Sequence, residues 1–217
     1  MRKKQQRFAD NRKSRNVIEP GKAFFENIKG NWNDFFGNKN ENVLELACGR
    51  GEYSTGFAAI YPKRNFIGVD IKGNRLWVGS KKARLDGLDN VAFLRTQIDH
   101  LEKFFNPGEI HEIWIIFPDP RPKSSDERRR LTSPKYLEIY QKLIKPGGFI
   151  HLKTDSSELF DYTLQLLEAR SDVTNLAYTW ELYKSKYVED HHSIKTKYEQ
   201  QFSDQGYEIK YLKFQFS

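Results

Sequence analysis

The stretch NVLELACGRGEY, residues 42–53, combines an apolar run with a turn that holds two glycines. The run NVLELA predicts a short buried strand, and the residues after Gly51 predict the start of a helix. Glycines between a strand and a helix let the backbone approach a ligand closely at the helix N-terminus. The stretch therefore predicts the first strand, turn and helix of an α/β domain that binds a ligand at this turn.

The segments that follow repeat this alternation of strand and helix. Apolar runs typical of buried strands recur at residues 65–71, 90–95, 109–117 and 148–155, and helical patterns separate them. Such alternation indicates a doubly wound, Rossmann-like and mostly parallel sheet, covered by helices on both faces. Two late runs, NLAYTWEL and YEIKYLKFQF, predict additional strands that are antiparallel. In this fold class ligands bind beyond the carboxyl ends of the strands.

Length and composition favour one cytoplasmic domain. The chain has 217 residues, no apolar stretch of about 18 residues that could cross a membrane, and no apolar leader at its N-terminus. Its one cysteine, Cys48, excludes an internal disulfide and a four-thiolate zinc site. His191 and His192 are adjacent and lack partners at metal-ligand spacing, so we expect an exposed loop there and no metal.

The positive charge is concentrated at the N-terminus. The net charge is +7, and residues 1–16 contain seven Lys or Arg and one acid, Asp10. We expect residues 1–16 to be a basic, flexible arm outside the fold and residues 17–217 to form the single domain. Such an arm either contacts nucleic acid or only aids solubility, and charge alone leaves both interpretations open.

Two acids flank the glycine turn and indicate the kind of ligand. Glu45 precedes Gly49 by four residues and would repel a phosphate, but it suits an amino group or a sulfonium. Asp70 ends the second predicted strand, where an acid can accept hydrogen bonds from ribose hydroxyls. With Gly49 and Gly51 these acids predict a cationic, nucleoside-bearing cofactor, S-adenosyl-L-methionine. Taken singly, each could instead be a turn residue, a surface acid or a strand-end cap.

Two further positions lie at predicted strand ends. Gln97 follows the third strand and is either an adenine contact or an ordinary polar loop residue. Asp119 stands between Pro118 and Pro120 after the fourth strand, and the fixed φ of proline makes this exit stiff. There it could orient a substrate and stabilise developing positive charge, or the segment is a turn without chemistry. The basic run that follows, from Lys123 to residue 130, could hold phosphates or be a solvated loop.

Five motifs occur in order between about Val43 and Phe214. They are ELACGRG (45–51), IGVDI (67–71), DPRPK (119–123) followed by RRRL (128–131), LKTD (152–155) and TKYE (196–199). On these motifs the chain resembles the bacterial tRNA (guanine-N7-)-methyltransferases. The resemblance implies the class I S-adenosylmethionine-dependent methyltransferase fold. It also implies methyl transfer to N7 of a guanosine in the variable loop of tRNA, which forms 7-methylguanosine.

The resemblance also assigns roles to individual residues. It implies cofactor contacts at Glu45, Asp70, Gln97 and Asp119, a catalytic role for Asp119, and tRNA contacts at Lys123, Asp155, Thr196, Lys197, Tyr198 and Glu199. The chain departs from the family pattern at Arg121, where the family has tryptophan, and at Gln97, where the family has Asp or Asn. The segment SSDE, residues 124–127 before the RRRL run, is a third departure from the family pattern.

Some of these positions have a structural interpretation as well. Asp155 and Glu158, and likewise Thr196 and Glu199, have the spacing of helix-capping pairs. Two other functions stay open from the sequence. One is a methyltransferase that acts on another substrate, and the other is a non-catalytic RNA-binding protein. The sequence leaves the oligomeric state undetermined.

Overall fold

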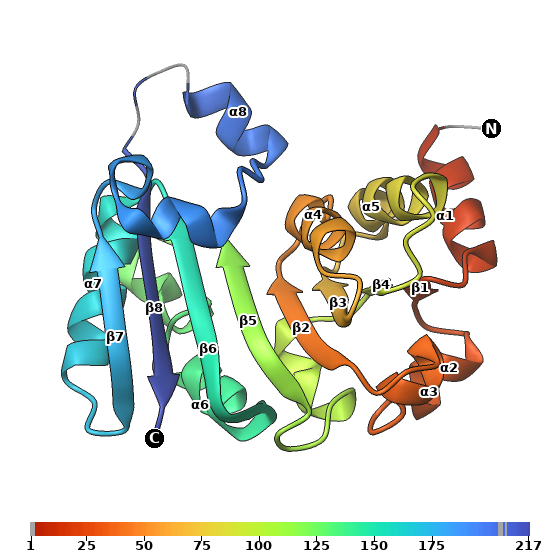
Figure 1. The fold of residues 1–217 in the computed structure, drawn as a ribbon, viewed down its shortest axis with the longest axis horizontal. Helices are drawn as coiled ribbons and strands as arrows, with labels where there is room; N and C mark the ends of the chain where they lie inside the picture. Colours follow the sequence, from red (N-terminus) through yellow and green to blue (C-terminus); the bar gives the residue numbers. More distant parts are fainter. Residues whose placement is uncertain (1–2, 204–205, 207) are drawn as a thin grey trace.

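The computed structural model describes residues 3–203, 206 and 208–217. Within these ranges eight strands form one sheet in the order β1-β4-β3-β2-β5-β6-β8-β7 (Figure 1). The strands are Val17–Ile18 (β1), Glu41–Leu46 (β2), Arg64–Val69 (β3), Val91–Leu94 (β4), Ile110–Ile116 (β5), Ile144–Thr154 (β6), Val173–Thr179 (β7) and Lys210–Phe216 (β8).

Most of the sheet is parallel. The pairs from β1 to β6 are parallel, whereas β8 pairs antiparallel with both β6 and β7. This confirms the predicted doubly wound sheet with late antiparallel strands. β2 lies between β3 and β5, so the strand order reverses beside the glycine turn, which is where doubly wound proteins bind ligands.

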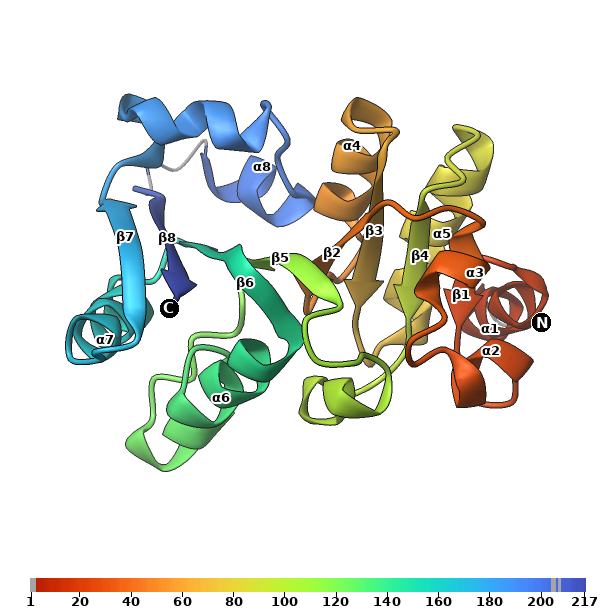
Figure 2. The same cartoon turned by 60° about the horizontal axis from the view of Figure 1, so that its bottom comes forward.

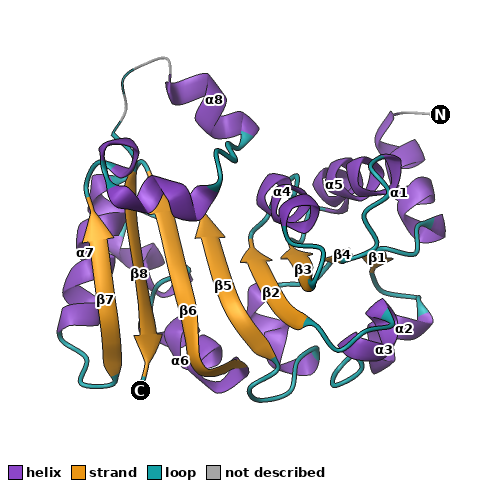
Figure 3. Cartoon of the chain, viewed as in Figure 1, coloured by secondary structure: helices purple, strands orange, loops and turns teal. Residues whose placement is uncertain are grey.

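Helices cover both faces of the sheet (Figures 2 and 3). The α-helices are Lys3–Lys13 (α1), Ala23–Asn27 (α2), Trp32–Phe36 (α3), Glu52–Ile60 (α4), Gly73–Leu85 (α5), Pro134–Leu143 (α6), Ser157–Glu168 (α7) and Lys197–Ser203 (α8). Short 3-10 helices are Ile98–Lys103 (η1), Ser124–Arg129 (η2), Leu182–Lys184 (η3) and Lys186–His191 (η4). None of the helices in the described ranges has the length and apolar content to cross a lipid bilayer.

Alternate residues of the strands pack into two separate cores. On one face Leu44 and Ile113 pack with residues of α3, α6 and α7. On the other face Val43 and Trp114 pack with residues of α4, α5 and η3. This division follows from the two-residue period of a strand, and it fixes the carboxyl ends of β2 and β5 side by side.

Residues 3–16 belong to the fold, in contrast to the expectation of an arm outside it. α1 packs along α5, where the buried Asn11 donates a hydrogen bond of 2.7 Å to the carbonyl of Gly73. Trp77 Nε1 donates to the Asp10 carboxylate at 2.9 Å. Polar contacts therefore hold α1 against α5. The sequence of α1 lacks the broad apolar stripe by which a packed helix is recognised.

A lysine closes the C-terminal end of α1. Lys22 Nζ donates to the carbonyls of Asn11, Ser14 and Val17 at 2.5–2.7 Å. An ammonium group at this end satisfies carbonyls that lack helical partners and complements the helix dipole. Residues 14–22 thus hold the basic helix against the domain.

Candidate functional site

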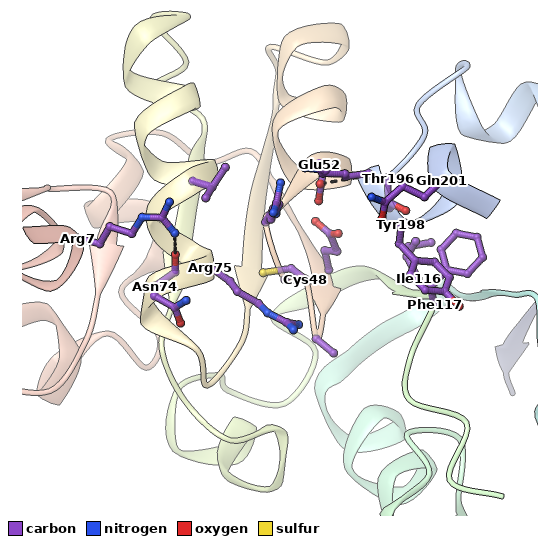
Figure 4. Close-up of a pocket in the computed structure, with 16 residues that line it drawn as sticks. Arg7, Cys48, Glu52, Asn74, Arg75, Ile116, Phe117, Thr196, Tyr198 and Gln201 are labelled. Atoms are coloured by element: carbon purple, nitrogen blue, oxygen red, sulfur yellow. Dashed lines mark hydrogen bonds between the residues drawn. The ribbon is translucent and has the colours of Figure 1, made fainter. Parts of the chain in front are cut away.

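A cavity of about 510 Å³ lies at the carboxyl ends of β2 and β5 (Figure 4). Its walls come from the β2–α4 turn, α5, the end of β5 and α8, and α1 contributes Arg7. Among the predicted site residues, Glu45, Gly49, Thr196, Lys197 and Tyr198 line this cavity. The structure therefore brings together the glycine turn and the TKYE segment, which are far apart in the sequence.

The turn between β2 and α4 requires left-handed backbone at three positions. φ is 52° at Ala47, 56° at Gly49 and 67° at Gly51. A Cβ added to Gly51 would lie 2.4 Å from the Phe93 ring, whereas one added to Gly49 would meet only a carbonyl oxygen at 4.0 Å. Gly51 is therefore required for packing inside the protein, and Gly49 leaves open space at the cavity wall.

Glu45 is the buried acid of the cavity. It is 4% exposed, and its Oε2 accepts hydrogen bonds from the amide and the hydroxyl of Ser54 at 2.7 and 2.6 Å. Burial raises the pKa of Glu45 to about 8, although the bonds from Ser54 act in the opposite direction. None of the described residues donates a hydrogen bond to its second oxygen, Oε1. A cation in the cavity would supply the missing partner.

Asp70 holds the glycine turn through hydrogen bonds to the backbone. Its Oδ2 accepts from the Gly49 amide at 2.9 Å and its Oδ1 from the Lys72 amide at 2.7 Å. The strand-end capping role is thus confirmed, and Asp70 does not itself line the cavity. Gln97 is exposed and precedes η1 at the end of β4, also outside the cavity wall.

Asp119 lies two residues beyond Phe117, which lines the cavity. Phe117 has a φ of 46°, so the chain leaves β5 in a left-handed conformation before Pro118. The Asp119 side chain is 64% exposed, and Arg121 Nε lies 3.1 Å from its carboxylate. Asp119 therefore lies outside the cavity lining and does not converge with Glu45 there.

One of the basic residues after the Pro-Asp-Pro segment has a structural role. Arg130 is buried, donates to the carbonyl of Arg121 at 3.1 Å and pairs with Glu158 at 3.1 Å. Its guanidinium also lies 4.4 Å from the centre of the Tyr162 ring. Arg130 is thus no solvated loop residue, because its buried guanidinium holds the loop. Lys123, Arg128 and Arg129 are exposed.

The later motifs place side chains in contact across the chain. Thr196 Oγ1 accepts from the Glu199 amide at 3.0 Å, which confirms that Thr196 caps α8. Asp155 does not cap α7, because Ser156 does so, and Asp155 instead accepts a bond of 2.9 Å from the Tyr198 hydroxyl. Glu199 is buried and paired with Lys153, so a direct tRNA contact requires its carboxylate to leave this position.

His191 does not lie in an exposed loop, contrary to the sequence-based expectation. It is 2% exposed, and its Nδ1 shares a hydrogen bond of 2.8 Å with the Tyr53 hydroxyl. Its ring also packs edge-on against Trp114 and Tyr211. The described residues contain no group of three or more side chains arranged to hold a metal ion.

Comparisons with known proteins agree with this geometry. The family described as "Putative methyltransferase" matches residues 39–212. A tRNA (guanine-N(7)-)-methyltransferase of Cytophaga hutchinsonii is 44% identical over 99% of this chain and 98% of its own length. One of Bacteroides thetaiotaomicron is 47% identical over 97% of this chain and 84% of its own length.

A solved structure shares the fold. The crystal structure of the 16S rRNA methyltransferase KamB superposes with a TM-score of 0.64 at 17% identity, over 87% of this chain and 93% of that one. At this identity the likeness concerns the fold alone, and it confirms the class I methyltransferase fold that the sequence predicts.

Proposed function

Because the chain belongs to the tRNA (guanine-N(7)-)-methyltransferase family, we propose that it transfers a methyl group from S-adenosyl-L-methionine to N7 of a guanosine in tRNA. The product is 7-methylguanosine, and we place the target in the variable loop. The main support is the identity of 44–47% to enzymes of that name along nearly the whole chain. We also propose that the enzyme acts in the cytoplasm.

The residues of the cavity fit S-adenosylmethionine by their chemistry. Glu45 lines the cavity and offers Oε1 to a cationic amino group, and Gly49 leaves room for close approach of the ligand. We assign Gly51 and Asp70 to the same site, because Asp70 fixes the turn through Gly49 and can accept from a ribose hydroxyl. When bound, the cofactor supplies an electrophilic methyl group on a sulfonium.

Two further cofactor contacts belong to the proposal. Gln97 follows β4 at the same edge of the sheet and carries both a donor and an acceptor for an adenine. Asp119 follows Phe117, a residue of the cavity lining, by two positions. Both side chains would have to turn toward the cavity, since neither lines it in this structure.

Methyl transfer to guanine N7 demands little acid–base chemistry from the protein. N7 has an in-plane lone pair and no proton, so no general base is needed. The work of the chain is to hold the guanine in line, and such positioning contributes about 7–11 kcal/mol in favourable cases. We assign Asp119 as the catalytic residue, because its carboxylate would stabilise the positive charge that develops on the purine.

The proposed tRNA contacts lie in the cavity lining and on the loop after β5. Lys123 is exposed beside the Pro-Asp-Pro segment and suits a phosphate. Lys197 and Tyr198 line the cavity, and Asp155 reaches it through the Tyr198 hydroxyl. Arg121, now paired with Asp119, could instead stack on the base or contact a phosphate once guanine enters.

Incubation with methyl-labelled S-adenosylmethionine and an unmodified tRNA transcript tests the proposal. Digestion and mass analysis of the nucleosides should show 7-methylguanosine, and fragment mapping should place it in the variable loop. A transcript with adenosine in place of the target guanosine is the control and should stay unlabelled. Label in another nucleoside would contradict the proposal, and cofactor binding without any transfer would favour a non-catalytic RNA-binding protein.

A further inference from the structure

The basic side chains of this protein fall into two groups. Many are paired with a carboxylate, among them Lys82, Lys135, Lys142, Lys184 and Arg170. Lys13, Lys81 and Arg84 are exposed and form no ion pair with any described residue, yet all three line one groove. We call it the α1–α5 groove. It is lined by Asp10, Lys13, Ser14, Arg15, Trp77, Lys81, Arg84 and Leu85 and encloses about 510 Å³.

The carboxylate in the lining of this groove does not neutralise its cations. Asp10 accepts hydrogen bonds from Gln6 and from Trp77 Nε1, both at 2.9 Å. These bonds, together with the nearby charges of Arg84 and Lys13, lower the pKa of Asp10 and keep it ionised. The single negative charge of Asp10 thus faces four positive charges in the groove lining, those of Lys13, Arg15, Lys81 and Arg84. The groove therefore has a net positive charge.

Arg7 contacts residues of both the groove and the active-site cavity. Arg7 lines the cavity and donates to the carbonyl of Asn74, and Figure 4 shows this contact at the α5 side of the cavity. Its guanidinium also lies 4.7 Å from the centre of the Trp77 ring, and Trp77 lines the groove. A chain of phosphates that leaves the cavity at Arg7 therefore continues along positive surface.

We propose that the α1–α5 groove binds the sugar-phosphate backbone of tRNA away from the methylated guanosine. Like charges gathered on one face repel each other in the free protein, and a polyanion relieves that repulsion on binding. Contacts to phosphate fix orientation without reading sequence, as a second contact surface requires. The inference rests on the proposed function and extends it beyond the cavity.

Two matched triple variants test the groove. K13Q/K81Q/R84Q removes three of its charges and keeps Arg15, because Arg15 donates to the carbonyl of Phe35 and supports the fold. The control, K39Q/K63Q/K145Q, removes three exposed lysines near the amino ends of β2, β3 and β6, at the edge of the sheet opposite the cavity. Thermal melts and cofactor titration should show that both variants are folded.

The measurement is tRNA affinity at several salt concentrations, with KM and kcat for methyl transfer. Each phosphate contact adds about 0.7–0.9 to the slope of log affinity against log salt. Loss of three contacts should therefore make the fold-decrease in tRNA affinity between about 50 and 200 mM salt about 20 to 40 times smaller in the groove variant than in the wild type. Its KM for tRNA should rise at low salt by more than its kcat falls. The control should match the wild type in affinity, slope and activity.

Three outcomes would overturn the groove proposal. The first is a groove variant whose tRNA affinity and salt slope match those of the control. The second is an equal loss of tRNA affinity in both variants. The third is a groove variant that no longer binds phosphatidylglycerol vesicles, which the wild type binds, but keeps its tRNA affinity. The two proposals fail separately. A wild-type protein that makes no 7-methylguanosine contradicts the proposed function, whereas an active wild type with an unaffected groove variant contradicts only the groove.

Discussion

Lys153 Nζ lies 2.6 Å from Glu199 Oε1, and both side chains are fully buried. Lys153 also donates to the Tyr53 hydroxyl at 3.0 Å, and the Tyr183 hydroxyl donates to Glu199. Because Lys153 belongs to β6 and Glu199 to α8, this ion pair fastens α8 to the sheet. The same helix supplies part of the cavity wall, so the pair links stability to the site.

Removal of Lys153 alone should be strongly destabilising. K153M leaves the Glu199 carboxylate buried without its cation, and its Oε2 already lacks a hydrogen-bond partner among the described residues. Loss of one partner of a buried pair typically costs about 3–5 kcal/mol. Urea unfolding should show a loss of that size in the free energy of unfolding, and K153M/E199L should lose less than the sum of the two single variants.

The matched control for this pair is Lys142, which forms an exposed ion pair with Glu102. K142M should change the free energy of unfolding by no more than about 1 kcal/mol. A K153M protein as stable as K142M would show that the buried pair does not hold α8.

The raised pKa of Glu45 predicts a pH dependence of stability. Between its ordinary value of 4.5 and about 8, the folded protein keeps a proton that the unfolded chain releases. Its contribution to the free energy of unfolding therefore falls as the pH rises through this range and becomes constant above about 8. Unfolding of the wild type and of E45Q from pH 5 to 9 should show this fall in the wild type alone.

Cofactor binding should depend on the same proton. A cation beside Glu45 favours the carboxylate, so binding below pH 8 releases a proton and affinity rises toward pH 8. Calorimetry in buffers of different ionisation heat measures that proton. In S54A the carboxylate loses a hydroxyl donor, so the rise should shift to higher pH. A wild type whose affinity and proton release match E45Q at every pH would rule out this role.

Local patterns in the sequence predict the strands, the glycine turn and the Thr196 cap, because each depends on neighbouring residues. They do not predict the docking of α1, since polar contacts such as Asn11 with Gly73 carry no periodic signal. Nor do they predict that Glu199 pairs with Lys153, because that contact joins α8 to β6 across the fold. The pattern places Asp119 correctly after β5, but its exposure depends on a left-handed Phe117 that no motif indicates.

The two turn glycines should respond differently to alanine. G51A combines left-handed strain of about 1–2 kcal/mol with overpacking against Phe93, which costs about 1–3 kcal/mol more. G49A carries only the strain, but its methyl group enters open space at the cavity wall. Unfolding should show that G51A loses more free energy of unfolding than G49A. Calorimetry should show that G49A loses more cofactor affinity than G51A, relative to the stability that each variant loses. The reverse order would contradict the assignment.

Arg130 should act as a positioning residue for the segment that holds Asp119. R130M removes its bonds to the Arg121 carbonyl and to Glu158, so the loop loosens. Because small displacements of a reacting group are costly, kcat should fall roughly 10- to 100-fold while cofactor affinity changes little. R130K should recover part of kcat, and R129M, at an exposed neighbour, should not lower it. An equal loss for R129M would show that positive charge on this loop, not anchoring, matters.

The catalytic assignment of Asp119 depends on its negative charge. D119N keeps the shape of the side chain between two prolines but cannot stabilise a cationic purine, so kcat should fall about 10²- to 10³-fold. Single-turnover methyl transfer to tRNA measures this step directly, and calorimetry measures cofactor affinity in parallel. D126N, which removes a partly buried acid that pairs with Arg129 in the adjoining η2 segment, should keep kcat within about twofold of the wild type. Full turnover and unchanged cofactor affinity in D119N would remove Asp119 from the mechanism and leave positioning as the main source of catalysis.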